Sequence, residues 1–141
     1  MNKEKLKQYR ALQKEIPKLK KDIQKLVDAL DEVPVVAGKV MKSSNEFPYT
    51  KQYITVEMRE PKKAAEIERQ IRAKEIRLQQ AEKDKSEIEE FIALIPDSAA
   101  RQMFELMYLS DKKMTQRKVG DMLGYDQSSV SLKMNKYLKA S

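Results

Sequence analysis

The sequence predicts a mostly α-helical fold, in which a long antiparallel helical hairpin with a small β-hairpin at its tip precedes a C-terminal three-helix helix-turn-helix domain. Three observations support this prediction. Residues 3–32 and 61–95 each carry apolar side chains mostly at three- and four-residue steps, the spacing of a helical stripe. The segment between them is rich in turn-forming and β-prone residues, and residues 115–135 have the caps and glycines of two crossing helices. We therefore expect one domain at 1–95 and a second at 96–141.

Residues 3–32 are expected to form the first long helix. Proline removes a helical hydrogen bond, so the helix should either bend at Pro17 or begin there with Pro17 in its first turn. The lysines around the apolar stripe are expected to form a solvated face, and direct DNA contact by them is the less favoured interpretation. The stripe consists of Leu6, Tyr9, Ile16, Leu19, Ile23, Leu26, Leu30 and Val33.

Residues 33–60 are expected to contain the small β-hairpin. Turn-forming residues divide the segment, and Tyr53-Ile54-Thr55-Val56 is β-prone. The pattern predicts strands near 38–42 and 52–57, joined by a loop through 46–49. We favour a cap that joins two helices, with Phe47 and Tyr49 packed onto it, over a tip that docks a partner.

Residues 61–95 are expected to form the second long helix, with Pro61 in a favourable first-turn position. A helix of that length spans about 50 Å and cannot bury its stripe alone. Antiparallel pairing with the first helix is the favoured arrangement, and self-association into a homo-oligomer through the same seam is the alternative. Lys74 and Lys85 fill two positions of a seam that contains Ile67, Ile71, Leu78, Ala81, Ile88, Ile92 and Ile95.

Residues 96–114 are expected to connect the second long helix to the two helices of residues 115–138. Pro96-Asp97-Ser98 should end the long helix and cap the next one, which is expected over 99–110 with mainly apolar residues facing a small core. Residues 111–114 are expected to form a short loop.

Residues 115–135 read TQRKVGDMLGYDQSSVSLKMN and predict a helix-turn-helix. A first helix should start after Thr115, an N-cap type, and run to Leu123, where Gly124 accepts the left-handed conformation that ends a helix. A second helix should begin near Asp126, another N-cap type, and run to Leu138.

Gly120 lies at the position of the first helix that faces the second. A glycine inside a helix costs about 1 kcal/mol relative to alanine, so it needs a packing reason such as a close crossing. On this interpretation valine at position 120 would separate the helices, whereas alanine would be tolerated. The apolar side of the motif is expected to comprise Val119, Met122, Leu123, Tyr125, Val130, Met134 and Tyr137.

The composition is that of a moderately basic protein, which suits binding to phosphate. The 141 residues include 29 basic and 22 acidic side chains, for a net charge of +7. The excess is concentrated in residues 1–30, with nine basic and four acidic side chains, and in residues 97–141, with eight and five. A basic protein attracts phosphate non-specifically, but many proteins share such a balance.

Missing residue types exclude several activities. The absence of Cys and His removes thiolate nucleophiles, imidazole bases, disulfides and the zinc sites built on those residues. With glycines only at 38, 120 and 124, there is no phosphate-cradling loop. We therefore expect no enzyme, no catalytic residue, no cofactor and no metal. The longest apolar stretch, 91–95, is too short for a membrane span, which favours a cytoplasmic protein without a membrane partner.

The sequence from Ile95, IPDSAARQMFELMYLSDKKMTQRKVGDMLGYDQSSVS, resembles region 4 of sigma-70-type transcription factors. The whole chain resembles the small phage and prophage late-gene regulators of the RinA/ArpU type, and SSNEFPYTKQYITVE is similar to one branch of that group. This resemblance implies transcriptional control in a bacterial cytoplasm by a protein encoded in an integrated phage. The sequence departs from the motif at its eighteenth position, which is usually apolar and is here Lys133, between Leu132 and Met134.

Within that framework the partner is double-stranded DNA, with RNA polymerase as a further possible partner. Gln127 could pair with an adenine edge, and Ser128 and Ser131 could contact bases or phosphates. Thr115 and Gln116 open the preceding helix, where free N–H groups suit phosphate. The expected DNA-binding residues are Thr115, Gln116, Arg117, Lys118, Gln127, Ser128, Ser129, Ser131, Leu132, Lys133, Asn135 and Lys136.

Two other functions stay open. The first is a phage DNA-packaging subunit of the small terminase kind, although such proteins usually place the DNA-reading part before the coil. The second is an adaptor whose helix-turn-helix docks RNA polymerase or a sigma factor.

Overall fold

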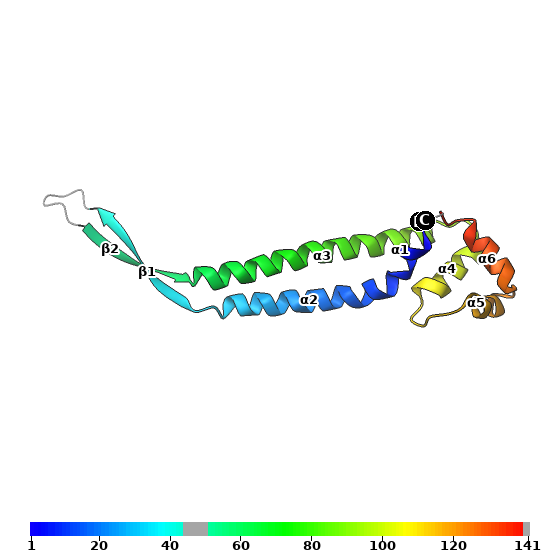
Figure 1. Cartoon of the computed structure of the whole chain (residues 1–141), viewed down its shortest axis with the longest axis horizontal. Coiled ribbons are helices and arrows are strands. Elements are labelled where there is room, and N and C mark those ends of the chain that lie inside the picture. Colours follow the sequence, from blue (N-terminus) through cyan, green and yellow to red (C-terminus); the bar gives the residue numbers. More distant parts are fainter. Residues whose placement is uncertain (44–50, 140–141) are drawn as a thin grey trace. The chain divides into compact units, whose positions relative to one another are not determined.

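The computed structural model describes residues 1–43 and 51–139, and the side chains of 1–34 and 60–139. The described elements are mainly helices, with one pair of strands between them (Figure 1). In chain order they are α1 (Lys3–Lys7), α2 (Tyr9–Asp31), β1 (Val35–Ser43), β2 (Lys51–Arg59), α3 (Pro61–Ala93), α4 (Ser98–Phe104), the π-helical segment η1 (Glu105–Leu109), α5 (Gln116–Leu123) and α6 (Gln127–Asn135).

The chain forms two compact units. Unit 1 combines residues 1–19 with residues 77–141, and unit 2 consists of residues 20–76. The expected boundary between residues 95 and 96 therefore falls inside unit 1, because the C-terminal helices share a core with the first 19 residues.

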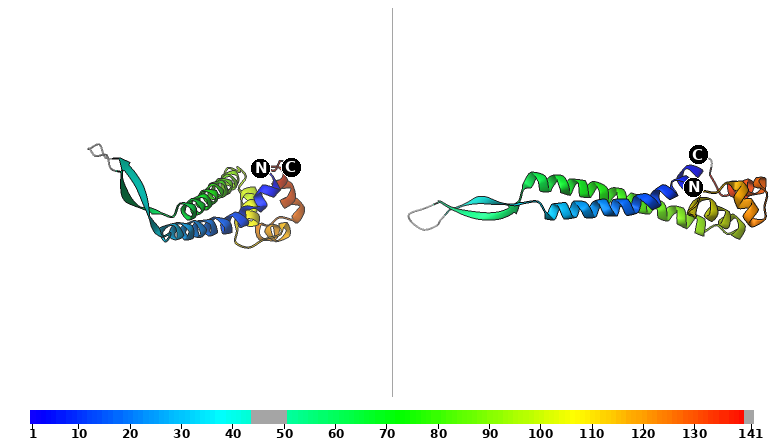
Figure 2. Two further views of the ribbon diagram at one scale, coloured as in Figure 1. Left: turned by 60° about the vertical axis from the view of Figure 1, so that its left-hand side comes forward. Right: turned by 90° about the horizontal axis from the view of Figure 1, so that it is seen from below.

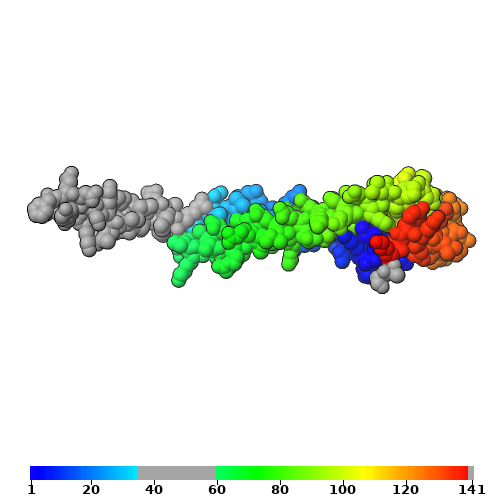
Figure 3. All heavy atoms as spheres, turned by 90° about the horizontal axis from the view of Figure 1, so that it is seen from above, coloured from blue at the N-terminus to red at the C-terminus, as the bar shows by residue number. Residues whose placement is uncertain are grey.

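The core of unit 1 brings together residues from both parts of the chain. In Figure 2, α1 lies beside the C-terminal helices, and Figure 3 shows their atoms adjoining. At the centre Phe104 is fully buried, with the Phe91 ring edge-on at 5.8 Å and the Tyr108 ring stacked at 6.1 Å. The buried cluster consists of Leu6, Tyr9, Leu12, Ile16, Leu19, Ala81, Ile88, Ile92, Ile95, Ala100, Met103, Phe104, Tyr108, Val119, Val130 and Met134.

Unit 2 contains the later part of α2, the first part of α3 and the two strands. Strands β1 and β2 pair antiparallel from Val35 opposite Arg59 to Ser43 opposite Lys51. The Lys74 ammonium lies 3.3 Å from the Asp22 carboxylate, which accounts for a lysine in the apolar seam. The half-buried seam residues include Ile23 and Leu26 of α2 and Ile67 and Ile71 of α3.

The predicted fold class needs correction at the hairpin. The prediction of a small β-hairpin is wrong, because each strand has nine residues rather than the expected five or six. The β-branched pair Val35-Val36 suits an extended backbone directly after Pro34, so the ladder starts three residues earlier than predicted. The predicted loop through 46–49 lies outside the described residues.

The first long helix also differs from its prediction over 3–32. It is divided at Gln8, which closes α1 by donating its backbone N–H to Lys5 O at 3.2 Å. No local sequence signal marks this break. Pro17, where a bend or a start was expected, lies inside α2, where its ring is exposed.

The C-terminal part is not the simple three-helix domain that the sequence predicts. The expected helix over 99–110 is α4, capped by Asp97, followed by the wider turns of η1. Ser110 ends this segment, because its N–H donates to Glu105 O at 3.0 Å and its hydroxyl donates to Leu106 O at 2.6 Å. Serine hydroxyls compete with the backbone for such carbonyls and thereby interrupt helices.

Candidate nucleic-acid interface

Helix α5 begins and ends where the sequence predicts. The Thr115 hydroxyl accepts a hydrogen bond from Lys118 N at 3.2 Å, which satisfies one of the free N–H groups at the helix start. Gly124 ends the helix in the left-handed conformation, with φ of 81°. An L-residue with a side chain rarely adopts that conformation, so the glycine is needed for the turn.

The turn folds back onto Gly120. Tyr125 N–H donates to Gly120 O at 2.8 Å. A Cβ atom on residue 120 would lie 2.4 Å from Tyr125 O and 3.3 Å from Val130 Cγ2. The expected tolerance of alanine at this position is therefore wrong, since even one methyl group would meet the backbone of the turn.

Helix α6 starts at Gln127, with Asp126 as its N-cap. The Asp126 carboxylate accepts from Ser129 N at 2.9 Å and from the Ser128 hydroxyl at 3.2 Å. Hydrogen bonds from the Ser129 side chain and backbone lower the pKa of Asp126, so the cap stays ionised. The helix ends at Asn135 rather than at the predicted Leu138.

The two faces of α6 are clearly distinguished. Val130 and Met134 are 0% and 1% exposed and enter the core, whereas Leu132 is 73% exposed. Met134 thus takes the inward position that the motif usually gives to its eighteenth residue, and Lys133 lies beside it, half-buried. The exposed residues of the helix are Gln127, Ser128, Leu132 and Asn135, with Lys136 following, and Ser129 and Ser131 are half-buried.

Lys133 is engaged within the protein. Its ammonium lies 3.2 Å from the Asp97 carboxylate and 5.5 Å from the centre of the Tyr125 ring. The hydrogen bond from Lys133 is the largest cause of the lowered pKa of Asp97. Lys133 therefore connects α6 to the N-cap of α4, which leaves its ammonium less free to hold a phosphate than the sequence suggested.

The other cations expected at phosphates are accessible. Arg117, Lys118 and Lys136 are exposed, and Thr115 is exposed at the start of α5 with the half-buried Gln116 next to it. Met122, which was expected on the apolar side of the motif, is 56% exposed, because α5 turns that position away from the core.

Arg10 positions the loop before α5, a role that the sequence did not reveal. Its Nε donates to Ser110 O at 3.1 Å, and its Nη2 donates to Met107 O and Lys112 O, both at 2.9 Å. The guanidinium thereby satisfies carbonyl groups at the end of η1 and fixes the loop that leads into α5. No local signal could indicate this role, since the partners lie about a hundred residues away in the sequence.

Comparison of the chain with protein-family models, with curated proteins and with solved structures finds no match. In the part of the chain that the structure describes, no helix has the length and apolar character needed to cross a membrane. Among these same residues, no group of three or more carboxylates gathers in a way that could hold a metal ion.

Proposed function

We propose that the chain is a sequence-specific DNA-binding regulator of transcription that inserts α6 into the major groove. The observation that carries this proposal is the contact between Gly120 and Tyr125, which holds two capped helices across a turn of three residues. A helix pair joined by a short, glycine-containing turn is the arrangement in which the N-terminal residues of the second helix reach base edges.

Three exposed side chains of α6 are suited to reading bases. The Gln127 amide, at the start of α6, can form two hydrogen bonds to an adenine edge. Asn135, at the other end of the helix, donates to the Ser131 hydroxyl at 3.3 Å and keeps its carbonyl and one N–H for a further polar contact. Leu132, at 73% exposure, can contact a thymine methyl group, which would account for a large apolar side chain on this face.

Phosphates on either side of the groove would be held by the residues around the two helix starts. Arg117, Lys118 and Lys136 supply charge, and Thr115 and Gln116 supply polar groups at the start of α5. The Ser128 hydroxyl donates to Asp126 and keeps its capacity to accept a hydrogen bond.

The biological setting is part of the proposal. The resemblance of residues 95–131 to sigma-70 region 4, and of the chain to RinA/ArpU-type regulators, supports a phage or prophage gene regulator that acts in the bacterial cytoplasm. RNA polymerase is a proposed partner on the same basis, and a second copy is proposed to bind through the helices of unit 2.

The test is selection of binding sites from random DNA with the full chain, followed by titration of a selected site and an unrelated duplex. Gln127→Ala should weaken specific binding by about 1–3 kcal/mol, the size expected for the loss of one side chain that hydrogen-bonds to a base. Non-specific binding should be unchanged. Gln79→Ala removes an exposed amide elsewhere in unit 1 and serves as the matched control. Failure to enrich any sequence would contradict the proposal.

Two measurements separate the alternatives. Light scattering would show a ring of many subunits if the chain were a packaging protein. Binding to RNA polymerase in the absence of DNA binding would identify an adaptor. A footprint upstream of neighbouring genes would then define the operator.

A further inference from the structure

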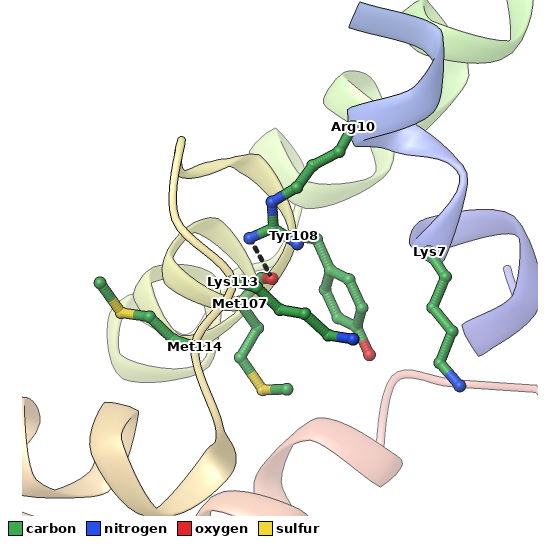
Figure 4. A pocket seen from close by; sticks show the side chains of 6 residues that line it. All are labelled: Lys7, Arg10, Met107, Tyr108, Lys113 and Met114. Atoms are coloured by element: carbon green, nitrogen blue, oxygen red, sulfur yellow. Dashed lines mark hydrogen bonds between the residues drawn. The ribbon is translucent and has the colours of Figure 1, made fainter.

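A pocket of about 340 Å³ lies in unit 1 beside the loop that enters α5 (Figure 4). It is lined by Lys7, Arg10, Met107, Tyr108, Lys113 and Met114. The volume lies within the range of small-ligand sites. None of the base-reading or phosphate contacts proposed for α5 and α6 uses these residues.

The pocket is strongly basic. Three of its six lining residues are cations, and none is a carboxylate. Like charges gathered in one pocket repel one another, so a bound anion would lower the electrostatic energy of the site. The charge of Arg10 is fixed there by its hydrogen bonds to Met107 O, Ser110 O and Lys112 O.

The other polar groups of the pocket are available to a ligand. The side-chain ammonium groups of Lys7 and Lys113 form no ion pair or hydrogen bond with any other residue that the structure describes, and neither does the Tyr108 hydroxyl. Burial raises the pKa of Tyr108, so its hydroxyl remains a neutral donor. In Figure 4 the polar ends of these three side chains extend toward the same edge of the pocket.

The apolar part of the lining favours an organic phosphate or a phosphodiester over a bare ion. Met107, Met114 and the Tyr108 ring offer a surface on which the remainder of such a ligand could rest, next to the cations. Met114 also directly precedes Thr115, the N-cap of α5, so the pocket adjoins the start of the reading helices.

We propose that this pocket binds a phosphate group through Lys7, Lys113 and the Tyr108 hydroxyl. The phosphate could belong to the DNA backbone or to a small phosphorylated compound, and both present the same chemistry to the three donors. If it belongs to DNA, this inference rests on the proposed function, because the N-terminal helices would then extend the DNA contact beyond the helix-turn-helix.

Calorimetric titration of the full chain with pyrophosphate tests the pocket itself. Lys7→Gln/Lys113→Gln should bind pyrophosphate at least about tenfold more weakly than wild type, the size of losing one hydrogen bond to a charged group. Tyr108→Phe, which keeps the ring stacked on Phe104, should weaken binding to a smaller extent. Lys14→Gln/Lys18→Gln removes two exposed charges outside the pocket and should retain wild-type affinity.

Titration of DNA at several salt concentrations distinguishes the two sources of phosphate. If the pocket holds the DNA backbone, Lys7→Gln/Lys113→Gln should lower the salt slope by about 1 for each phosphate that the variant no longer neutralises, relative to Lys14→Gln/Lys18→Gln. An unchanged slope with impaired pyrophosphate binding would assign the pocket to a small phosphorylated compound. Equal pyrophosphate affinities of the two double variants would overturn the proposal of a phosphate pocket. If the wild-type protein bound pyrophosphate but did not bind DNA, only the proposed function would be overturned.

Discussion

Replacing Gly120 with alanine should destabilise unit 1, even though alanine is the better helix former. The added Cβ would lie 2.4 Å from Tyr125 O, far inside van der Waals contact, and 3.3 Å from Val130 Cγ2. The oxygen belongs to the backbone and cannot rotate away as the end of a flexible side chain could. Tyr125 is also held by the hydrogen bond from its N–H to Gly120 O at 2.8 Å, so relief requires movement of the whole turn.

The size of the effect follows from two opposing terms. Overpacking typically costs about 1–3 kcal/mol, and a contact of this kind with backbone belongs at the upper end. Alanine recovers about 1 kcal/mol of helix propensity, which leaves a net loss of about 2 kcal/mol in the free energy of unfolding. At about 2–4 °C for each kcal/mol in a chain of roughly this length, the melting temperature should fall by roughly 4–8 °C. Valine should lower it further.

Thermal unfolding followed by circular dichroism measures this effect, with DNA affinity as the second readout. Asp121→Ala is the matched control, because it introduces alanine at the next, exposed position of α5. That variant should melt at or slightly above the wild-type temperature. A Gly120→Ala protein that melts as high as Asp121→Ala would show that the helices do not cross at residue 120, and the helix-turn-helix geometry would have to be abandoned.

Three further predictions concern charge, pH and the shared core. Lys118→Ala and Lys136→Ala should each weaken binding to all duplexes alike and reduce the salt slope by about 1, and a slope unchanged in both would remove them from the phosphate contact. Burial, followed by the hydrogen bond to Glu89, raises the pKa of Tyr9 to about 12, above its unfolded value of 10.0. The neutral phenol therefore contributes stability that is present below pH 10.0 and lost as the pH rises through about 12, and Tyr9→Phe should show a smaller alkaline loss in chemical denaturation. Leu6→Ala should lower the free energy of unfolding by about 2–5 kcal/mol, because Leu6 is fully buried in the core that carries α6. It should also weaken DNA binding, and wild-type DNA affinity in a variant destabilised by that amount would contradict the link between the core and α6.

The elements that the sequence predicted well are those encoded by neighbouring residues. Thr115, Gly124 and Asp126 each act on the backbone within a few residues, so their types alone place the ends of α5 and the start of α6. The apolar stripes were predictable for the same reason, since a helix converts sequence spacing directly into a face.

The features that the sequence did not reveal depend on distant partners. The break at Gln8 and the π-helical turns of η1 lack a local signal, and Arg10 acts on carbonyl groups that follow it by about a hundred residues. The sequence identified Gly120 as a crossing position but not that alanine would clash there. The clash is with Tyr125 O, whose position is set by the path of the turn. Lys133 was expected to contact phosphate, and the sequence did not show that it pairs with Asp97, 36 positions away.

The shared core of unit 1 also has a consequence for the order in which the unit can fold. Leu6 to Leu19 are made before the residues that bury them, which extend to Met134. Contacts of such long sequence separation slow folding, and the early segment stays exposed until its partners have been made. The apolar stripe of residues 6–19 is therefore expected to stay accessible, and open to non-specific contacts, until the residues up to Met134 are available to cover it.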